Sequence, residues 1–397
     1  RDIGARFAQY DRAMRLLINT SVLRFGGAVQ VALSLIHECR SYDQNEYHVV
    51  LGPGVGAVLD PAEFPDNFYF HHQDFGVMNL RKLPRVQQKM SVIEAQVRPD
   101  CVATTSGPPY WRSRAPHLVG FNLPLYIYPE SPYLRALPFR AKARLSARKW
   151  LHRRLFRRDA DALIVQTDDV NVRVRRLLGT DKVYTVTNNH NGWYDSPGNY
   201  PSRLPERKHG AFRLLTVTSY YPHKNLDLIP QVIEALPEAL RSRVEFVLTL
   251  TEAEYRSRIS PKIPPQVRLV GPVPPPECPA LYRECDAMFL PTLAECFSAS
   301  YPEAMKMEKP IVTTDLGFAR SICGDAALYF PPCDAAAAAG QVERLIGDAK
   351  LQEKLRRNGR ERLAAFDSPA ERARKILEIC NDLVEGTEQI CAVERRA

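Results

Sequence analysis

The chain has 397 residues, more than one hydrophobic core usually serves, so its length favours two domains. Its composition, 45% hydrophobic and 25% charged, excludes disordered and fibrous proteins, and no apolar run reaches the roughly eighteen residues of a membrane-spanning helix. The nine cysteines form no CxxC pair, and the first residues lack the apolar core of a signal peptide. We therefore expect a reduced, cytoplasmic protein.

The formal net charge of +9 is concentrated in one segment. Between Ser131 and Arg158 there is no acidic residue, and without the ten basic residues there the chain has 44 basic and 45 acidic ones. The ten are Arg135, Arg140, Lys142, Arg144, Arg148, Lys149, Arg153, Arg154, Arg157 and Arg158. The basic character thus belongs to one segment and not to a general polyanion-binding surface.

In the first half of the chain, short apolar runs alternate with helical patterns, as in α/β folds. We predict that 51–56 is a loop and that the turn Gly26-Gly27 joins the first strand to the first helix. The predicted strands are 15–19, 47–51, 101–104, 162–165 and 183–186, and the predicted helices are 29–37 and 83–96. This pattern indicates a parallel sheet covered by helices.

Turn-forming residues dominate 189–210, and the alternation restarts beyond them. The predicted strands here are 212–217, 244–250, 267–270, 287–290 and 311–313, and the predicted helices are 226–236, 279–284 and 299–307. From Asp334 onward we expect helices, with breaks near 340–347, Asn358 and Ser368-Pro369.

The expected fold class is α/β, with two Rossmann-like, doubly wound domains that face a central cleft. We expect one domain at 1–195, a linker at 196–210 and a second domain at 211–370. The remaining helical segment, 371–397, is expected to cross back to the first domain. Ligands of such folds bind at the carboxyl ends of the strands, so the chemistry should lie between the domains.

The most informative segment runs from Glu295 to Met305 and follows a predicted strand. Small residues at 298–300 open a helix whose free N–H groups and positive dipole end suit a phosphate. Glu295 precedes this helix and Glu303 lies about one turn inside it, and carboxylates accept hydrogen bonds from hydroxyls. A ligand with both hydroxyls and a diphosphate, such as a nucleotide sugar, suits this arrangement.

The two glutamates and the seven residues between them resemble the signature of retaining glycosyltransferases of family 4, which have the GT-B fold. The resemblance extends to 271–273, 309–317 and 324–330, whereas the first half matches only in organisation. It implies an acceptor-side domain at 1–195 and a nucleotide-sugar-binding domain at 211–370.

The resemblance also implies roles for single residues. Glu295 corresponds to the glutamate that contacts the donor sugar, and Glu303 to the one that holds the nucleotide ribose. The backbone that meets the sugar and the diphosphate corresponds to Phe297, Ser298 and Ala299.

Other parts of the chain carry further implied contacts. Lys224 corresponds to the lysine that neutralises the leaving diphosphate, whereas Ser219 stands where the family usually has an arginine. Gly26 and Gly27 match the glycine loop at the donor diphosphate, although such a turn is by itself often only a turn.

Two residues lie near the position of an acceptor-side histidine of the family, Asn122 and the displaced His117. The alternatives are that Asn122 is a turn residue and His117 a packed one. Asp159-Ala160-Asp161 has the DxD form of a metal-nucleotide site but directly precedes a predicted strand, and the adjacent His71-His72 cannot chelate one ion. We therefore expect neither a metal nor a cofactor, the nucleotide sugar being a substrate.

The basic segment is predicted to form a helix from Pro138 to Arg158. Its basic end consists of Arg148, Lys149, Arg153, Arg154, Arg157 and Arg158, and one broad side carries Ala141, Leu145, Leu151, Leu155 and Phe156. Such a helix suits an anionic membrane surface, with the alternatives of an ordinary solvated helix or of a patch that binds an anionic acceptor.

The resulting hypothesis is a retaining, metal-independent glycosyltransferase that moves a hexosyl group from a nucleoside diphosphate to a hydroxyl of a saccharide or lipid-linked saccharide. It would be cytoplasmic or peripheral on the inner face of a membrane. A nucleotide-sugar epimerase on the same fold and a nucleic-acid-binding protein remain as alternatives, although the confinement of the charge to one segment disfavours nucleic acid.

Overall fold

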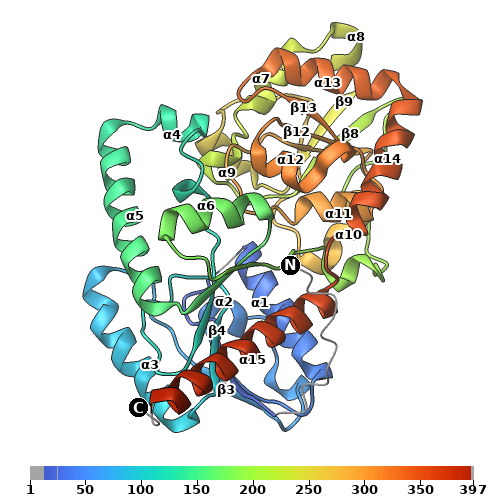
Figure 1. Cartoon of the computed structure of the whole chain (residues 1–397). Helices are drawn as coiled ribbons and strands as arrows, with labels where there is room; N and C mark the ends of the chain where they lie inside the picture. The colour runs from blue at the N-terminus through green and yellow to red at the C-terminus, as the bar shows by residue number, and fades with distance from the viewer. Residues whose placement is uncertain (1–12, 25, 395–397) are drawn as a thin grey trace. The chain divides into compact units, whose positions relative to one another are not determined.

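The computed structural model describes residues 13–24 and 26–394. It contains two parallel sheets with helices around them, so the expected fold class is confirmed (Figure 1). By contacts the chain divides into two compact units. The first unit consists of 1–121, 152–164 and 373–397, and the second of 122–151 and 165–372. The second unit thus includes 122–151 and 165–195, which were expected to belong to the first domain.

The first sheet has seven strands in the order β3-β2-β1-β4-β5-β6-β7. They are β1 (Arg15–Asn19), β2 (Glu46–Leu51), β3 (Phe68–His72), β4 (Cys101–Thr104), β5 (His117–Gly120), β6 (Ala162–Val165) and β7 (Val183–Thr185). Leu16 lies opposite Tyr47 of β2 and Cys101 of β4, and all three are fully buried. Burial on both faces explains why these central strands are nearly continuous apolar runs.

The helices of this half differ in length and in how they end. They are α1 (Gly27–Glu38), α2 (Pro53–Gly56), α3 (Leu83–Val97), α4 (Pro132–Ala136), α5 (Phe139–Asp159) and α6 (Asp168–Leu178). Thr167 caps α6 by accepting the amide of Val170 at 3.2 Å, and Gly179 ends it in the left-handed conformation. The helix α2 corrects the expectation of a loop at 51–56, because Pro53 presets the backbone angle of a first helical residue.

Two helices that lie far apart in the sequence pack in the first unit. α3 packs Val86, Met90 and Ile93 on a sheet face that presents Leu17 and Val102. α15 (Pro369–Glu394) belongs to the first unit from residue 373 onward. Its buried side includes Ala373, Ile376, Leu377 and Cys380, and the free thiols of Cys380 and Cys101 of β4 are hydrogen-bonded to each other.

The second sheet has six strands in the order β10-β9-β8-β11-β12-β13. They are β8 (Phe212–Thr216), β9 (Val244–Leu248), β10 (Val267–Leu269), β11 (Ala287–Leu290), β12 (Ile311–Thr314) and β13 (Ala327–Phe330). α7 (Leu228–Ala235) and α13 (Ala335–Gly347) lie side by side over this sheet and share its core with Phe246, Phe289 and Phe330 (Figure 1).

The remaining helices are short, apart from α14. They are α8 (Glu238–Arg241), α9 (Glu252–Arg258), α10 (Cys278–Arg283), α11 (Ser300–Lys306), α12 (Gly317–Cys323) and α14 (Ala349–Leu363). α13 ends at Gly347 and α15 begins at Pro369, so the breaks predicted near 340–347 and at Ser368-Pro369 are confirmed, whereas α14 runs through Asn358 and the break predicted there is wrong. Between α13 and α14 the chain breaks at Asp348, whose side chain caps α14 by accepting the Leu351 amide at 2.9 Å.

Candidate functional site

The second unit brings Lys224 and Glu295 together at the carboxyl ends of neighbouring strands. Lys224 ends a short 3-10 helix, Pro222–Lys224, after β8, and Glu295 follows β11, which pairs with β8. The Lys224 ammonium forms an ion pair with Glu295 Oε1, and the two side chains are only 14% and 11% exposed. The Thr292 hydroxyl donates to the same oxygen at 3.0 Å. The structure therefore holds a largely desolvated cation and anion at the sheet edge where ligands of this fold class bind.

Backbone contacts fix the loop that carries Lys224. The carbonyl of His223 accepts a hydrogen bond from the Leu293 amide at 2.8 Å, and the Thr292 hydroxyl oxygen lies 3.4 Å from the same carbonyl. Asn225 follows Lys224 with φ 55°, a left-handed conformation that asparagine tolerates better than most residues. These contacts tie the loop after β8 to the loop after β11 and so position the ion pair.

Residues that the sequence did not indicate also surround this pair. The buried Ser131 hydroxyl donates to the Leu293 carbonyl at 2.7 Å, across 162 positions of the chain. The ring of His223 stacks on that of Tyr221, with centroids 5.5 Å apart, and meets the edge of Tyr133 at 6.1 Å. Burial lowers the pKa of His223, which keeps its ring neutral beside the Lys224 ammonium. Only the position of His223 next to Lys224 could have marked it in advance.

The second predicted glutamate, Glu303, lies inside α11 and contacts the segment before the expected linker. Its carboxyl is hydrogen-bonded to Tyr194, and burial raises its pKa to about 7 although that hydrogen bond lowers it. Asp195 holds the same segment on α11 through an ion pair with Lys306 at 2.5 Å. Burial thus favours the protonated form of this carboxyl, which accepts fewer hydrogen bonds from hydroxyls than the carboxylate does.

The stretch between the two glutamates leads into α11. Ser298 is buried, and the ring of Phe297 packs edge-on against Phe366 at 6.0 Å. Ala299 is the N-cap residue, and no side chain caps this helix. Ser219 is exposed in the loop after β8, and its carbonyl accepts the hydroxyl of Thr218 at 2.8 Å. Because residue 219 is a serine, it supplies no positive charge where the family usually has an arginine.

The predicted glycine turn lies in the first unit at the carboxyl end of β1. Gly26 has φ 82°, which glycine adopts without strain, and Gly27 begins α1. A Cβ atom built on Gly27 would have no neighbour within 4 Å. The backbone here is thus open to the approach of a ligand.

The acceptor-side residues differ in their surroundings. His117 is completely buried in β5, where its Nε2 lies 2.7 Å from the Thr104 hydroxyl and burial lowers its pKa to about 3. Its ring packs on Trp111 with centroids 5.4 Å apart. His117 therefore has the contacts of a packed residue. Its geometry supports this role over that of an acceptor-side histidine. Asn122 is half-buried in the loop that follows β5.

Both carboxylates of the DxD sequence have structural partners. Asp159 is buried and paired with Arg158 at 2.5 Å, and Asp161 accepts the amide of His117 at 2.9 Å. Over the part of the chain that the structure describes, no group of three or more His, Cys, Asp or Glu side chains is arranged to hold a metal ion.

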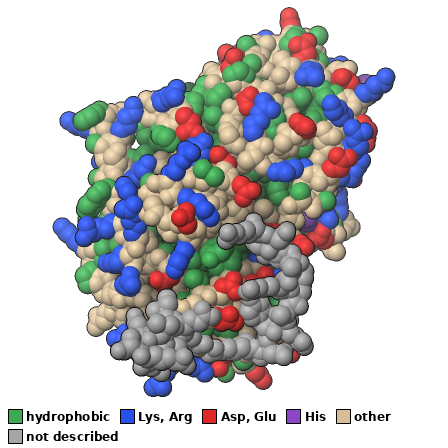
Figure 2. Space-filling view, viewed as in Figure 1, with side chains coloured by type: hydrophobic (Ala, Val, Ile, Leu, Met, Phe, Trp, Pro, Cys, Tyr) green, Lys and Arg blue, Asp and Glu red, His purple; other side chains and the backbone are tan. Residues whose placement is uncertain are grey.

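The basic segment, 131–158, comprises α4 and nearly all of α5. Figure 2 shows Lys and Arg side chains gathered along α4 and α5. At the predicted basic end, Arg148 is hydrogen-bonded to the hydroxyl of Tyr126, and Arg158 forms an ion pair with Asp159. Arg153, Arg154 and Arg157 are exposed. Within the described ranges, no helix is long and apolar enough to cross a bilayer.

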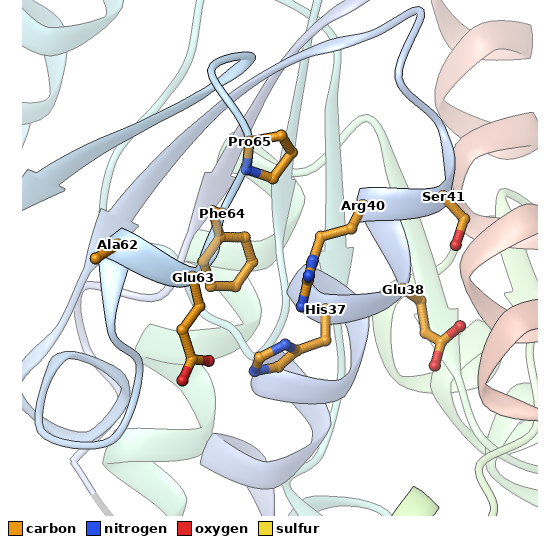
Figure 3. Close-up of a pocket in the computed structure, with 8 residues that line it drawn as sticks. All are labelled: His37, Glu38, Arg40, Ser41, Ala62, Glu63, Phe64 and Pro65. Carbon is orange, nitrogen blue, oxygen red and sulfur yellow. The ribbon is translucent and has the colours of Figure 1, made fainter.

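A hollow of about 630 Å³ lies in the first unit, at the amino ends of β2 and β3 (Figure 3). The Arg40 guanidinium stands 5.5 Å from the ring centroid of Phe64, and the His37 ring lies 5.1 Å from it. The complete lining is His37, Glu38, Arg40, Ser41, Ala62, Glu63, Phe64 and Pro65. These residues lie at the end of α1 opposite Gly27, about 18 Å along the helix, and none of them was predicted to belong to the site.

Comparisons with known proteins identify the fold and a related family. Residues 203–362 match the family of glycosyl transferases group 1. Sucrose-phosphate synthase from Thermosynechococcus elongatus has 15% sequence identity and a TM-score of 0.73, covering 94% of this chain and 100% of its own. HepE from Anabaena, solved with UDP and glucose, has 16% identity and a TM-score of 0.66, covering 92% and 98%.

A third solved structure is WaaG, a glycosyltransferase involved in lipopolysaccharide biosynthesis, with 16% identity, a TM-score of 0.66 and coverage of 92% and 99%. No curated protein sequence matches the chain. At these identities the solved structures establish the fold, and the family match covers residues 203–362. The chain therefore has the GT-B fold, and its residues 203–362 match the family of glycosyl transferases group 1.

Proposed function

We propose that the protein is a retaining, metal-independent glycosyltransferase of the family 4 type. It transfers a hexosyl group from a nucleoside diphosphate sugar to a hydroxyl of a saccharide or lipid-linked saccharide. The observation that carries this proposal is the desolvated Lys224–Glu295 pair at the carboxyl ends of β8 and β11. The UDP and glucose found with HepE support a uridine nucleotide as the first donor to test.

Lys224 acts on the leaving group. As the bond between the sugar C1 and the phosphate oxygen breaks, negative charge develops on the diphosphate, and the ammonium neutralises it in a site with little water. Before the donor binds, Glu295 satisfies this ammonium, so the cation is held in place without being exposed. With the donor bound, Glu295 faces the sugar and accepts hydrogen bonds from its hydroxyls.

The acceptor oxygen attacks C1 from the face that the diphosphate leaves, which retains the configuration. The acceptor proton passes to the departing phosphate oxygen, so no protein base is needed for charge balance. Lys224 supplies the charge that a divalent cation supplies in other glycosyltransferases. The DxD carboxylates, each engaged in a structural contact, support a mechanism that does not use them.

We further place the protein at the inner face of a membrane, where the acceptor is carried on a lipid. The concentration of positive charge on α5 supports this location, since an anionic lipid surface attracts such a helix.

Donor turnover by site variants tests the proposed reaction. Lys224→Ala and Glu295→Gln should each lower release of nucleoside diphosphate from a UDP-sugar at least 100-fold, the size of effect seen when one transition-state contact is removed. Lys262→Ala and Glu343→Gln change exposed residues of the same unit and should leave the rate unchanged. Activity should persist with a chelator present. Normal turnover by either site variant would remove that residue from the mechanism, and a strict need for a divalent cation would contradict metal independence.

A further inference from the structure

The first four turns of α5 pack very little against the protein. From Phe139 to Arg154 no side chain is buried, and only Leu155, Phe156 and Asp159 are buried in the last turn. A helix in a globular protein usually buries one apolar stripe. The exposed part of α5 spans about 24 Å, so it presents an unusually large free surface.

The apolar side expected from the sequence is not this surface. Phe156 packs on Phe121, with ring centroids 5.2 Å apart, and Leu155 is 3% exposed. Ala141, Leu145 and Leu151 on the same side are half-buried. This side of α5 is therefore less exposed than the opposite side.

The opposite side of α5 carries two large aromatic residues in the open. Phe139 is 84% exposed and Trp150 is 63% exposed. Eleven positions separate them, so at about 100° per residue they lie about 20° apart around the axis and about 16 Å apart along it. Exposed residues with small side chains, Ala143, Ser146 and Ala147, lie between them. We call this the outer face of α5.

Cations flank the outer face, and residues 139–158 of the helix include no acidic residue. Lys142 and Arg153 lie on one side of the line from Phe139 to Trp150, Arg154 lies on the other, and Arg157 continues it; all four are exposed. Asp159, the acid of this helix, is buried and paired with Arg158. Two aromatic side chains that project from a ring of cations fit an interface that is apolar inside and anionic at its surface.

We propose that the outer face of α5 docks on an anionic lipid bilayer, with Phe139 and Trp150 inserted among the headgroups and Lys142, Arg153, Arg154 and Arg157 on the phosphates. This inference rests on the proposed function only in that a lipid-borne acceptor gives the docking a purpose. The distribution of the cations favours a bilayer over a nucleic acid, because they are confined to a single helix and do not follow a groove.

Vesicle sedimentation without any substrate tests the docking. The full chain should sediment with vesicles of phosphatidylcholine and phosphatidylglycerol but stay in solution with phosphatidylcholine alone, and salt should release it. Replacement of Arg153, Arg154 and Arg157 by serine should lower the partition coefficient about 100-fold, and Phe139→Ala with Trp150→Ala about tenfold. The control variant, Lys350→Ser, Lys354→Ser and Arg357→Ser on α14, removes the same charge from exposed positions and should bind like the wild type.

Tryptophan fluorescence provides the second readout. Anionic vesicles should shift the emission of the wild type to shorter wavelength and leave that of Trp150→Phe unshifted, because the remaining tryptophans do not lie on α5. Equal loss of binding in the α5 and α14 variants, unchanged binding of the aromatic variant, or tighter binding of duplex DNA or RNA than of vesicles would overturn the proposal. Stabilisation of the wild type by a UDP-sugar tests the proposed transfer separately, so either idea can fail alone.

Discussion

Replacement of Glu303 by glutamine should make the protein more stable and its donor binding weaker at the same time. The reason is the pKa of the Glu303 carboxyl, which burial raises to about 7. The folded state keeps the proton between pH 4.5 and 7, whereas the unfolded chain releases it. Folding stability from this group therefore falls as the pH rises through this range.

The size of the effect follows from the difference in pKa. A rise from 4.5 to about 7 corresponds to up to about 3 kcal/mol of unfavourable free energy when the carboxyl is ionised. Glutamine carries no charge to desolvate, so at pH 8 Glu303→Gln should melt roughly 5 to 10 °C above the wild type. At pH 5 the carboxyl is protonated in the folded wild type, and most of the difference should disappear.

Donor binding should change in the opposite direction. Only the ionised carboxylate accepts strong hydrogen bonds from ribose hydroxyls, so the affinity of the wild type for a UDP-sugar should rise about tenfold from pH 6 to pH 8. Glu303→Gln should bind about tenfold more weakly than the wild type at pH 8 and lose this pH dependence. Tyr194→Phe removes the hydrogen bond that lowers the pKa, which should move the midpoint of the wild-type profile to higher pH.

Thermal melting between pH 5 and 8 and isothermal titration with a UDP-sugar measure both effects. Glu343→Gln on the exposed surface of α13 is the control, and it should alter neither. Equal melting temperatures of wild type and Glu303→Gln at pH 8 would refute the assigned pKa. A flat donor affinity in the wild type would refute the role of Glu303 as a ribose ligand.

Three further changes have defined outcomes. Gly27→Ala should keep its melting temperature, since a Cβ there meets no atom within 4 Å, but should weaken donor binding in a titration; unchanged affinity would show that the glycine turn does not meet the diphosphate. Ser219→Arg should tighten donor binding about tenfold by adding a second cation, whereas Ser242→Arg on the exposed surface should not; equal affinities would exclude a contact at 219. The pKa of His117, lowered to about 3 by burial, means that the folded state resists protonation below pH 6.5, so stability should fall by about 2 kcal/mol from pH 6.5 to pH 5. His117→Gln should remove this part of the pH dependence in denaturant titrations, and an identical slope in both proteins would contradict it.

The strands at the centre of each sheet could be predicted almost to the residue. β1, β4, β6 and β11 are short apolar runs between polar or turn-forming residues, and burial on both faces leaves little freedom in their composition. Two strands of the first sheet were missed for physical reasons. β3 is an edge strand with an exposed Tyr69 and adjacent histidines, and β5 opens with His117, which is buried only because Thr104 provides a hydrogen-bond partner.

The residues of the candidate site also divide into those that the sequence could predict and those that it could not. Glu295, Glu303 and Lys224 could be predicted because they lie in short segments whose spacing resembles that of a known family. Ser131 and Tyr194 could not, because their contacts join residues that only the folded chain brings together, and Thr292, three residues before Glu295, carries no distinguishing pattern. The outer face of α5 was also hidden, since the sequence shows two apolar sides and cannot tell which one the protein covers.

The first unit is assembled from three separate stretches of chain, and the last of them, which contains α15, is made only after the whole second unit. During synthesis the sheet around β1 and β4 therefore lacks Ile376, Leu377 and Cys380 in its core until α15 has been made. Until then the nascent chain exposes an apolar surface that a chaperone can bind, although domains usually fold in the order of synthesis. The second unit, whose core cluster lies between Leu214 and Leu355, can fold earlier.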